Sequence, residues 1–398
     1  MKKSPENRIL KNKQLIVGIT GSVAAYKAVE LIRRLKDKGA SVRPVMTDAS
    51  SRFITPMSVE LAAGAMPLSG MFDKPLSHVD ITAGADLLLV APATANTLGK
   101  FAQGMADDLL SAMFMAFRGP VLVAPAMNPR MYDSPVLRRN LDFLKGLGVV
   151  EIPPGEGALA CGEEGKGRMA EVDVILQYVE AALWGRKDLA GRKVVVTAGP
   201  TREHLDPVRF ISNRSSGRMG FEMARAALMR GAEVVLISGP SSLVPPAGAR
   251  LIMVERAAEM RDEVMKEIGG AYMLVMCAAV ADFAPASSSG GKLTKDEVRS
   301  IELSPTPDIL SEAASSAARP RIVVGFAAET GDSMDRARKK LAAKGADLIV
   351  FNNVLAPGAG FDVLTNKVTV IGRHGEQDLP LMTKHEAAHE IIDIAIRL

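Results

Sequence analysis

One pattern occurs twice along the chain: an apolar run, a loop of small residues, and a segment whose apolar residues recur at helical spacing. The first copy reads LIVGIT, GS and VAAYKAVELIRRLKDKG, and it ends at Gly39. The second copy reads KVVVTAGPT, a longer loop through SNRSSGRMG, FEMARAALMRG and a further run, AEVVLISG. A strand, a loop and a helix in this order open a doubly wound α/β domain. The chain is therefore predicted to contain two such domains.

Further apolar runs are predicted to be strands. They read SVRPVMT, DLLLVAP, PVLVAPA and VVEIP in the first half, and RLIMVE, YMLVMCAA, RIVVGFAAE and DLIVFN in the second. Nearly all are apolar throughout, as expected of parallel strands that are covered on both faces. The predicted fold class is α/β, with two doubly wound Rossmann-like domains and mostly parallel sheets.

The chain has 398 residues, more than one hydrophobic core usually organises. A helix that ends at Trp184 and Gly185, followed by charged residues up to Arg192, predicts a hinge. We therefore expect a disordered tail over residues 1–12, one domain over 13–184 and another over 188–398. The stretch APASSSGGKLTKDE is predicted to be a mobile loop within the second domain.

Composition limits the function. Aromatic residues make up only 4% and the net charge is only +4, which argues against nucleic-acid binding and suits small anionic substrates. The two cysteines lie far apart without metal-ligand spacing, so neither a disulfide nor a zinc site is expected. A cytoplasmic location is expected for the same reason. No apolar run reaches the roughly 18 residues that span a bilayer, and the longest, around Tyr272–Ala281, is predicted to be a buried strand.

The first turn, GITGS, carries Gly21 and Ser22 between a strand and a helix. Backbone N–H groups at such a turn favour a phosphate, although small residues there also serve packing alone. Thr47 ends the next predicted strand, and the loop APATANT follows another. Ligands of this architecture bind at the carboxyl ends of the strands, so these residues mark a candidate site.

Three further residues of the first domain indicate catalysis. His78 precedes a buried strand, Asn128 ends the strand PVLVAPA, and Cys161 lies in the glycine-rich loop GEGALACGEEGKGRM, which is expected to close over a site. Each alone also fits a structural role, as a surface or capping histidine, a turn asparagine and a buried thiol. Their joint placement near the edge marked by GITGS favours a shared site.

The second domain lacks the G-x-G-x-x-G spacing directly after its first strand, so a nicotinamide dinucleotide is not predicted. The residues Asn213, Ser215, Ser216 and Gly217 form a donor-rich approach to a helix, suited to phosphate or carboxylate or simply to capping. Asp282 follows a buried strand, and Lys292 and Lys295 lie in the loop beyond, where solvated charges are the plain alternative.

The motifs together resemble a known family. GITGSVAAYK, SHVDI, APATANT, PAMNPRMY and ACGEEGKGRM are similar to the flavin-containing cysteine decarboxylases. ISNRSSGRMG, AAVADF, the lysine loop, TPDI, GFAAET and the pair Lys340 and Lys344 follow the order of a ligase. Nearly the whole chain resembles the bifunctional coenzyme A biosynthesis family, which joins phosphopantothenoylcysteine decarboxylase to phosphopantothenate–cysteine ligase.

For the first domain, the resemblance implies FMN and three catalytic side chains. His78 would act as a base while the flavin accepts a hydride, Asn128 would hold the carboxylate that leaves as carbon dioxide, and Cys161 would donate the proton that completes the reduced product. The residues implied to bind FMN are Gly21, Ser22, Thr47, Ala93, Thr94 and Ala126.

For the second domain, the resemblance implies that CTP activates phosphopantothenate as an acyl-cytidylate and that cysteine displaces CMP, with Mg²⁺ or Mn²⁺. Asn213 would contact the acyl intermediate and Lys292 would assist the chemistry. The residues implied to bind CTP are Met276, Cys277, Ala278, Asp282, Lys292, Pro307, Asp308, Ile309, Phe326, Lys340 and Lys344. Relatives are homo-oligomers with trimeric flavin-domain and dimeric ligase-domain contacts, and the same is expected here.

Three residues depart from the family pattern. Tyr132 replaces a tryptophan, Thr294 replaces a lysine in KLTK, and Ala284 stands where a basic residue is frequent. A flavin prenyltransferase or a peptide-cysteine decarboxylase would not explain the ligase motifs. A regulatory subunit that has lost a catalytic group is disfavoured because His78, Asn128 and Cys161 are all present.

Overall fold

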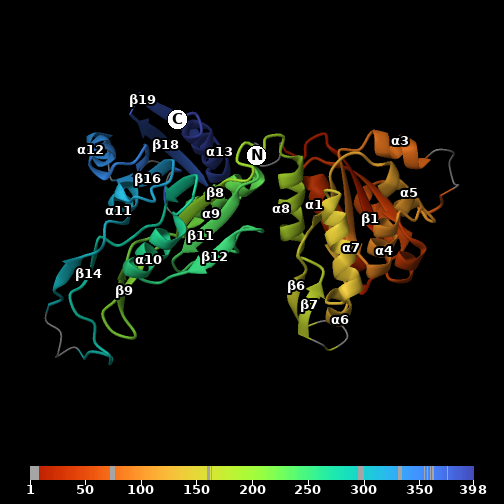
Figure 1. Ribbon diagram of the computed structural model, residues 1–398, viewed down its shortest axis with the longest axis horizontal. Coiled ribbons are helices and arrows are strands. Elements are labelled where there is room, and N and C mark those ends of the chain that lie inside the picture. The colour runs from red at the N-terminus through yellow and green to blue at the C-terminus, as the bar shows by residue number, and fades with distance from the viewer. Residues whose placement is uncertain are drawn as a thin grey trace. The chain divides into compact units, whose positions relative to one another are not determined.

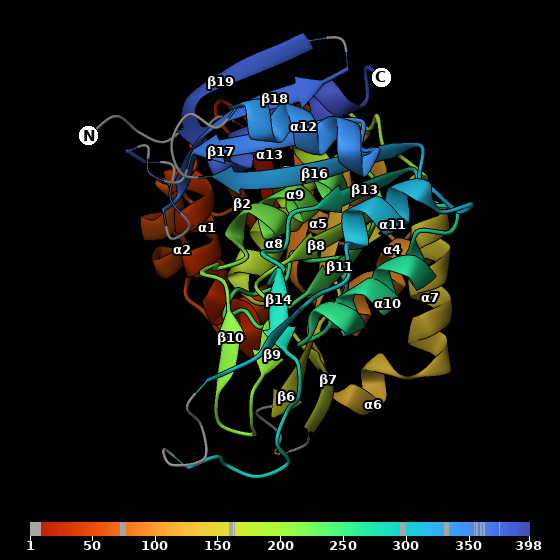
Figure 2. The ribbon, with the colours of Figure 1, turned by 90° about the vertical axis from the view of Figure 1, so that its left-hand side faces the viewer.

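The computed structural model consists of two compact units, Met1–Gly185 and Arg186–Leu398 (Figures 1 and 2). It describes residues 9–71, 77–158, 162, 164–294, 300–329, 334–353, 355, 357–358, 360, 363–373 and 375–398. The backbone but not the side chain is described at Ser77, His78, Ala158 and Glu329. Among these residues, no helix combines the length and apolar character that crossing a membrane requires.

The N-terminal unit is built on a five-stranded sheet in which all strands run parallel, in the order β2-β1-β3-β4-β5. Its strands are β1 (Gln14–Ile19), β2 (Ser41–Met46), β3 (Leu87–Ala93), β4 (Val121–Pro125) and β5 (Val150–Glu151). They coincide with the predicted runs, which confirms the α/β fold for this half of the chain.

Helices cover both faces of this sheet, which explains why its strands are apolar throughout. On one face lie α1 (Lys27–Asp37), α2 (Pro56–Ala63) and α8 (Val172–Leu183). On the other lie α4 (Ala95–Gln103), α5 (Leu109–Ala116) and α7 (Pro135–Gly146). The side chains of β1 alternate between the two cores, with Leu15 in the first and Ile16 in the second. The short elements η2 (Val23–Tyr26), η3 (Asp48–Arg52), α3 (Ser77–Ala83) and α6 (Pro129–Tyr132) complete the connections.

The C-terminal unit is built on an eight-stranded sheet in the order β12-β11-β8-β13-β16-β17-β18-β19. The strands up to β17 pair in parallel, whereas β18 pairs antiparallel with both of its neighbours. Their bounds are β8 (Lys193–Ala198), β11 (Glu233–Ser238), β12 (Arg250–Met253), β13 (Met273–Met276), β16 (Ile322–Glu329), β17 (Leu348–Asn353), β18 (Thr365–Gly372) and β19 (Gly375–Thr383). The prediction of a mostly parallel sheet is confirmed.

This sheet also separates two cores. One contains α9 (Arg218–Met229) and α13 (Lys384–Ala395), and the other contains α10 (Ala257–Glu267), α11 (Ile309–Ser315) and α12 (Met334–Lys344). Figure 2 shows α9 and α13 together on one side of the strands. Helix α13 is the last element of the chain, yet it packs against α9, which follows the first strand of the unit.

Two predicted loops contain antiparallel ribbons. The glycine-rich segment around Cys161 holds β6 (Gly155–Ala158) paired with β7 (Glu164–Arg168), while residues 159–161 and 163 lie outside the described part of the chain. The Ser- and Gly-rich segment is flanked by β14 (Phe283–Pro285) paired with β15 (Leu303–Pro305), and residues 295–299, Lys295 among them, again lie outside it. Both predicted loops are therefore flanked by paired antiparallel strands.

The ends of the predicted domains show two differences from expectation. Leu10 is buried and the N–H of Asn12 donates to the carbonyl of Gly39 at 3.1 Å, so residues 9–12 are packed rather than disordered. Residues 1–8 lie outside the described range. The charged segment after Gly185 is fixed to the C-terminal unit, because Arg186 pairs with Asp393 at 3.1 Å and Leu189 is buried.

Candidate functional sites in both units

The carboxyl edge of the first sheet gathers the residues predicted to bind a flavin. Gly21 and Ser22 follow β1, Thr47 follows β2, and Thr94 follows β3. Ala126 and Asn128 follow β4. Because the strands are parallel, these loops emerge at one edge of the sheet, where ligands of doubly wound domains bind.

Hydrogen bonds tie these loops to one another. The hydroxyl of Thr20 donates to the carbonyl of Pro92 at 2.8 Å and accepts from the N–H of Thr94 at 3.1 Å. The N–H of Ala126 donates to the carbonyl of Ala93 at 3.0 Å. Thr94 also caps α4, because its hydroxyl accepts from the N–H of Thr97. The edge is therefore a fixed arrangement of hydroxyl and N–H groups next to a helix N-terminus.

Asn128 lies where this edge meets the ribbon β6–β7. Its Oδ1 accepts from the N–H of Arg130 at 2.8 Å, which fixes the side chain at the start of α6. The N–H of Met127 donates to the carbonyl of Gly167 on β7 at 2.9 Å. A Cβ at Gly167 would come within 2.3 Å of the carbonyl oxygen of Met127, so only glycine permits this approach. The ribbon that flanks Cys161 is thus held directly against the loop of Asn128.

The two remaining predicted catalytic groups of this unit are not described as side chains. His78 lies in α3, where only its backbone is described, and Cys161 lies outside the described residues. Tyr132, which replaces the family's tryptophan, is 5% exposed. Its hydroxyl donates to Glu151 at 2.7 Å, so its role here is in the core beside β5.

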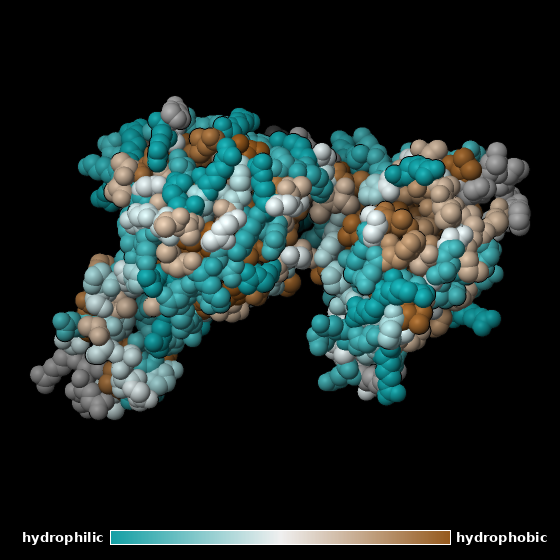
Figure 3. Space-filling view, in the orientation of Figure 1, coloured by the Kyte–Doolittle hydropathy of each residue, from teal (hydrophilic) through white to brown (hydrophobic). Residues whose placement is uncertain are grey.

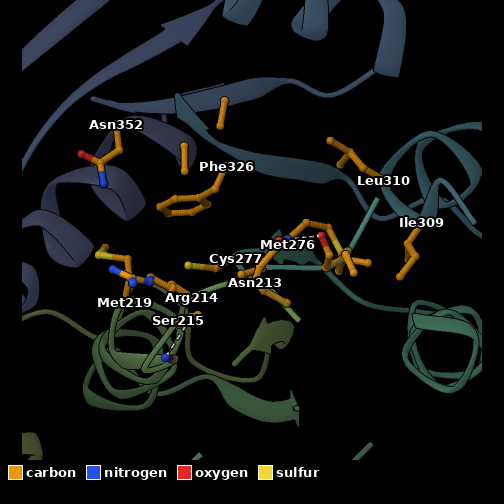
Figure 4. Close-up of a pocket in the computed structure, with 18 of the residues that line it drawn as sticks. Asn213, Arg214, Ser215, Met219, Met276, Cys277, Ile309, Leu310, Phe326 and Asn352 are labelled. Atoms are coloured by element: carbon orange, nitrogen blue, oxygen red, sulfur yellow. Dashed lines mark hydrogen bonds between the residues drawn. The ribbon is translucent and has the colours of Figure 1, made fainter. Parts of the chain in front are cut away.

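The C-terminal unit contains a cavity of about 730 Å³ at the carboxyl ends of β13 and β16 (Figure 4). The predicted residues that line it are Asn213, Ser215, Ser216, Gly217, Met276, Cys277, Ala278, Asp282, Pro307, Asp308, Ile309, Phe326, Lys340 and Lys344. In Figure 4, Met219 and Arg214 lie at one end and Ile309 and Leu310 at the other, with Asn213 and Phe326 between them. One cavity thus unites motifs that are far apart in sequence.

Two buried threonines hold the wall of this cavity in place. The hydroxyl of Thr197 on β8 accepts from the N–H groups of Cys277 and Ala278, each at 3.1 Å. The hydroxyl of Thr201 accepts from the N–H of Ala281 at 3.0 Å. These bonds hold the backbone after β13 against the end of β8. The segment after β13 is irregular rather than helical, and its small side chains line the cavity.

The approach to α9 requires glycine. Gly217 stands at the N-cap of this helix with φ +78°, and a Cβ there would lie 3.0 Å from the backbone nitrogen of Gly199. The hydroxyl of Ser215 accepts from the N–H of Gly217 at 3.1 Å and shapes the turn. The N-terminus of α9 can therefore face the cavity with its backbone close to the sheet, a setting suited to an anion.

The opposite end of the cavity carries a charge pair. Lys344 on α12 forms an ion pair with Asp308, the N-cap of α11, and the ammonium of Lys340 donates to the carbonyl of Phe326 at 2.9 Å. Between the two ends lies Cys277, where burial raises the pKa of the thiol to about 12, against the opposing effect of the Lys384 charge. This thiol is therefore protonated at neutral pH.

Lys292 does not line the cavity; it is exposed on the loop beyond β14. This loop is anchored next to Lys292, because the N–H of Leu293 donates to Asp206 at 3.2 Å and Arg209 donates to the carbonyl of Leu293. Although burial alone would raise the pKa of Asp206, the N–H groups of Val208, Arg209 and Leu293 lower it to about 2. Asp206 belongs to the hairpin of β9 (Arg202–His204) and β10 (Phe210–Ser212), which the sequence did not predict.

The two other departures from the family pattern lie near this loop. Ala284 is in β14, opposite Ser304 of β15, and Thr294 is exposed. Sequence reasoning did not select Arg214, Arg218, Thr306, Asn352, Asn366 and Lys384, although all six line the cavity. Arg214 and Arg218 lie within the motif SNRSSGRMG and could have been chosen with it, whereas Lys384 has no local motif to mark it.

Known proteins match both units. Residues 3–183 match the family described as Flavoprotein, and residues 189–398 match the DNA/pantothenate metabolism flavoprotein C-terminal domain. The coenzyme A biosynthesis bifunctional protein CoaBC of Bacillus subtilis is 44% identical over 393 residues, which cover 96% of this chain and 97% of that protein. Its counterpart in Escherichia coli is 39% identical over 392 residues, with 96% and 97% covered.

The chain belongs to this family of bifunctional coenzyme A biosynthesis proteins. This confirms the resemblance inferred from the motifs, and with it the class of a two-activity enzyme in which a flavoprotein decarboxylase domain precedes a ligase domain.

Solved structures resemble the units one at a time. A crystal structure of the C-terminal domain of a CoaBC protein is 38% identical with a TM-score of 0.45, covering 52% of this chain and 96% of that one. A PPC decarboxylase mutant complexed with pantothenoylaminoethenethiol is 34% identical with a TM-score of 0.40, covering 42% and 97%.

Proposed function

We propose that the cavity of the C-terminal unit activates 4'-phosphopantothenate with CTP and couples it to cysteine. The observation that carries this proposal is that one cavity gathers Asn213, Asp282, Phe326, Lys340 and Lys344 from motifs spread over the whole unit. Its volume of about 730 Å³ is in the range of small-molecule sites and leaves room for a nucleotide.

The ligation takes place in two displacements. A carboxylate oxygen of phosphopantothenate attacks the α-phosphorus of CTP, the acyl-cytidylate forms, and pyrophosphate leaves. The amine nitrogen of cysteine then attacks the acyl carbon, loses a proton, and expels CMP. The amide of Asn213 lies in the cavity wall and would contact the acyl group, while cations such as Lys340 would stabilise charge on the phosphates. Lys292 would reach this site from its anchored loop.

A divalent ion, Mg²⁺ or Mn²⁺, would arrive with the phosphates of CTP. Such ions are held through one or two carboxylates together with substrate phosphates. Among the described residues, no group of three or more metal-ligating side chains occurs, while Asp282 and Asp308 do line the cavity. The residues present therefore fit a metal bound mainly by the nucleotide.

We propose that the N-terminal unit binds FMN at its carboxyl edge and decarboxylates the ligase product. The hydroxyls of Ser22, Thr47 and Thr94 and the N-terminus of α4 fit the phosphate and polar groups of this cofactor. FMN supplies reversible acceptance of a hydride from the thiol-bearing carbon, which allows the adjacent carboxylate to leave as carbon dioxide.

Three side chains of this unit would carry out the other steps of the decarboxylation. The amide of Asn128 would bind the substrate carboxylate until it leaves, and His78 would take the proton of the substrate thiol. Cys161 would give its proton to the enethiol carbon in the last step. In the sequence it lies between β6 and β7, and β7 contacts the loop of Asn128. That step needs a free thiol, which suits the reducing cytoplasm.

Two assays test these roles separately. Purified protein with phosphopantothenate, cysteine, CTP and Mg²⁺ should form CMP and pyrophosphate in equal amounts, and pyrophosphate release that does not depend on CTP would contradict the ligase role. Protein given phosphopantothenoylcysteine should be yellow and release carbon dioxide. Colourless protein that releases none would contradict the decarboxylase role. Cys161→Ser should still release carbon dioxide but accumulate the unreduced enethiol.

We also propose that the chain is a homo-oligomer with trimeric flavin-domain and dimeric ligase-domain contacts. The N-terminal unit exposes the large side chains of Tyr26, Phe53, Met57 and Leu61. Figure 3 also shows hydrophobic residues, coloured brown, on the face of this unit that is turned toward the viewer. The C-terminal unit exposes Val208, Phe210, Phe283 and Leu303 on two ribbons that pack together. Sedimentation of the full chain should give a species larger than a monomer, which Leu61→Glu should reduce in size.

A further inference from the structure

A hydrogen bond between Asn213 and Val280 joins two loops that line the cavity of the C-terminal unit. The amide nitrogen of Asn213, directly after β10, donates to the carbonyl of Val280, in the segment after β13, at 2.9 Å. Asn213 is exposed, and an exposed side chain samples several rotamers unless a bond holds it in one of them. The direction of this amide therefore depends on how firmly the two loops are held together.

Thr201 holds the residues on both sides of Val280. It is fully buried between β8 and β9 and is not among the described residues that line the cavity. Its hydroxyl accepts from the N–H of Ala281 at 3.0 Å, and its own N–H donates to the carbonyl of Ala279 at 3.4 Å. Because Val280 lies between these two alanines, Thr201 fixes the carbonyl that accepts the asparagine amide.

The remaining polar group of Thr201 holds the other loop. Its carbonyl accepts from the hydroxyl of Ser212 at 2.7 Å, and Ser212 directly precedes Asn213. Ser212 also pairs with Arg202 in the ladder of β9 and β10. The N–H, the hydroxyl and the carbonyl of one buried threonine thus all bond to direct neighbours of Asn213 or Val280.

We propose that Thr201 is a positioning residue for the ligase reaction, which holds the amide of Asn213 in the direction that contacts the acyl group. The proposal rests on the ligase function proposed above and adds to it a residue behind the cavity wall. A polar group stabilises charge at a reacting carbonyl only where it is already aimed at that carbonyl, so a small rotation of Asn213 lowers the rate. Phe326 and Lys344, which are proposed to bind CTP, lie on other elements, so the affinity for CTP should change little.

The release of CMP by the full chain, given CTP, phosphopantothenate, cysteine and Mg²⁺, tests this role. Thr201→Val keeps nearly the same shape and removes the hydroxyl that accepts from Ala281. Its kcat should fall about tenfold, while the KM for CTP stays within about threefold of the parent value. Thr201→Ser keeps the hydroxyl and should keep kcat within about threefold of the parent. An unchanged kcat in Thr201→Val, or equal losses in the two variants, would overturn the proposal.

A double-mutant cycle with Asn213→Ala shows whether Thr201 acts through Asn213. Once the amide has been removed, no group remains to be positioned. Thr201→Val should therefore lower kcat by less than about threefold when it is added to Asn213→Ala. A loss of folded protein would instead lower kcat by the same factor with and without the amide. The full loss of about tenfold in the Asn213→Ala protein would overturn the proposal.

Thr197 provides a matched control for this cycle. It is also a fully buried threonine, and its hydroxyl accepts two N–H groups of the same segment, neither of them from a direct neighbour of Val280. Thr197→Val should change kcat by the same factor with and without Asn213→Ala. If it couples to Asn213→Ala as strongly as Thr201→Val does, the cavity wall moves as a whole and the specific role of Thr201 is wrong.

A second variant decides the question if Thr201→Val does not fold. Ser212 is exposed, and Ser212→Ala removes the bond to Thr201 from the other loop. Its kcat should fall by about threefold or more, and this loss should disappear in the Asn213→Ala protein, whereas a loss that persists there would overturn the proposal. If the parent protein releases no CMP in the presence of CTP, the ligase function itself is wrong. If the parent protein is active and the effects are independent of Asn213, only the role of Thr201 is wrong.

Discussion

The side-chain amide of Asn213 donates to the carbonyl of Val280 at 2.9 Å and joins the loop after β10 to the segment after β13. Both segments line the cavity of the C-terminal unit. The bond fixes the side-chain amide of Asn213 relative to the segment after β13.

Asn213→Ala should lower kcat/KM for CTP-dependent pyrophosphate release by about tenfold or more. It removes a hydrogen bond of roughly 1 kcal/mol and the proposed contact to the acyl group. Carbon dioxide release from phosphopantothenoylcysteine, measured on the same sample, should be unchanged. Equal losses in the two assays would mean that the residue acts on general stability.

Gly217→Ala should destabilise the C-terminal unit by about 1–2 kcal/mol and weaken CTP binding, because alanine is strained at φ +78° and meets the backbone of Gly199. Thermal unfolding and CTP titration measure both effects. Gly269→Ala is the control, since a Cβ there meets nothing within 4 Å. Equal unfolding temperatures for the two variants would mean that position 217 does not require glycine.

Asp206→Asn should lower kcat for ligation more than it changes the CTP dissociation constant. The substitution weakens the anchor of the Lys292 loop and leaves the cavity wall intact. Because the folded pKa of Asp206 is lowered to about 2, the anchor is present above the ordinary pKa near 4 and is lost as the pH falls toward 2. Stopped-flow ligation and calorimetry separate the two constants, and a change confined to CTP affinity would exclude this role.

His389 should make the C-terminal unit less stable in weak acid. Burial and the neighbouring charges of His385 and Arg230 lower its pKa to about 2 from an ordinary value near 6.5. The folded state therefore binds fewer protons than the unfolded chain, and stability is lost as the pH falls below about 6.5.

Urea unfolding at pH 7.5 and pH 5.5 measures this difference. His389→Gln should reduce the difference between the two midpoints, whereas His204→Gln, at a less buried histidine of the same unit, should retain it. An unchanged difference in His389→Gln would assign the acid sensitivity to other groups.

Thr94→Val should lower the amount of flavin retained by the N-terminal unit. It removes the cap of α4 and a hydroxyl at the carboxyl edge, at a cost of about 1 kcal/mol in helix stability. Thr55→Val removes the corresponding cap of α2, a helix that holds none of the proposed FMN residues. The ratio of flavin to protein absorbance should fall in the first variant only, and equal losses would argue against a flavin contact.

The sequence predicted the parallel strands whose carboxyl edges carry the sites, since fully buried parallel strands leave long apolar runs such as those around Leu89 and Val275. It did not predict the antiparallel strands β18 and β19, which complete the second sheet. It did not predict the hairpin β9–β10 or the ribbon β14–β15, because strands of three residues carry too little periodicity to be recognised.

In the candidate sites, too, the sequence predicted some residues and not others. Residues within motifs, such as Asn213 and Asp308, were found from sequence and line the cavity. Lys384 was not found, because only the packing of α13 on α9 brings it there. The roles of His78 and Cys161 stay predictions, since their side chains lie outside the described part of the chain.

The most direct test of two linked activities uses cysteine labelled in its carboxyl carbon. Incubated with the purified protein, phosphopantothenate, CTP and Mg²⁺, it should yield labelled carbon dioxide in an amount equal to the pyrophosphate formed, and none when CTP or phosphopantothenate is omitted. Labelled carbon dioxide released without CTP, or pyrophosphate formed with no labelled carbon dioxide, would contradict the account of a ligase that supplies a decarboxylase on the same chain.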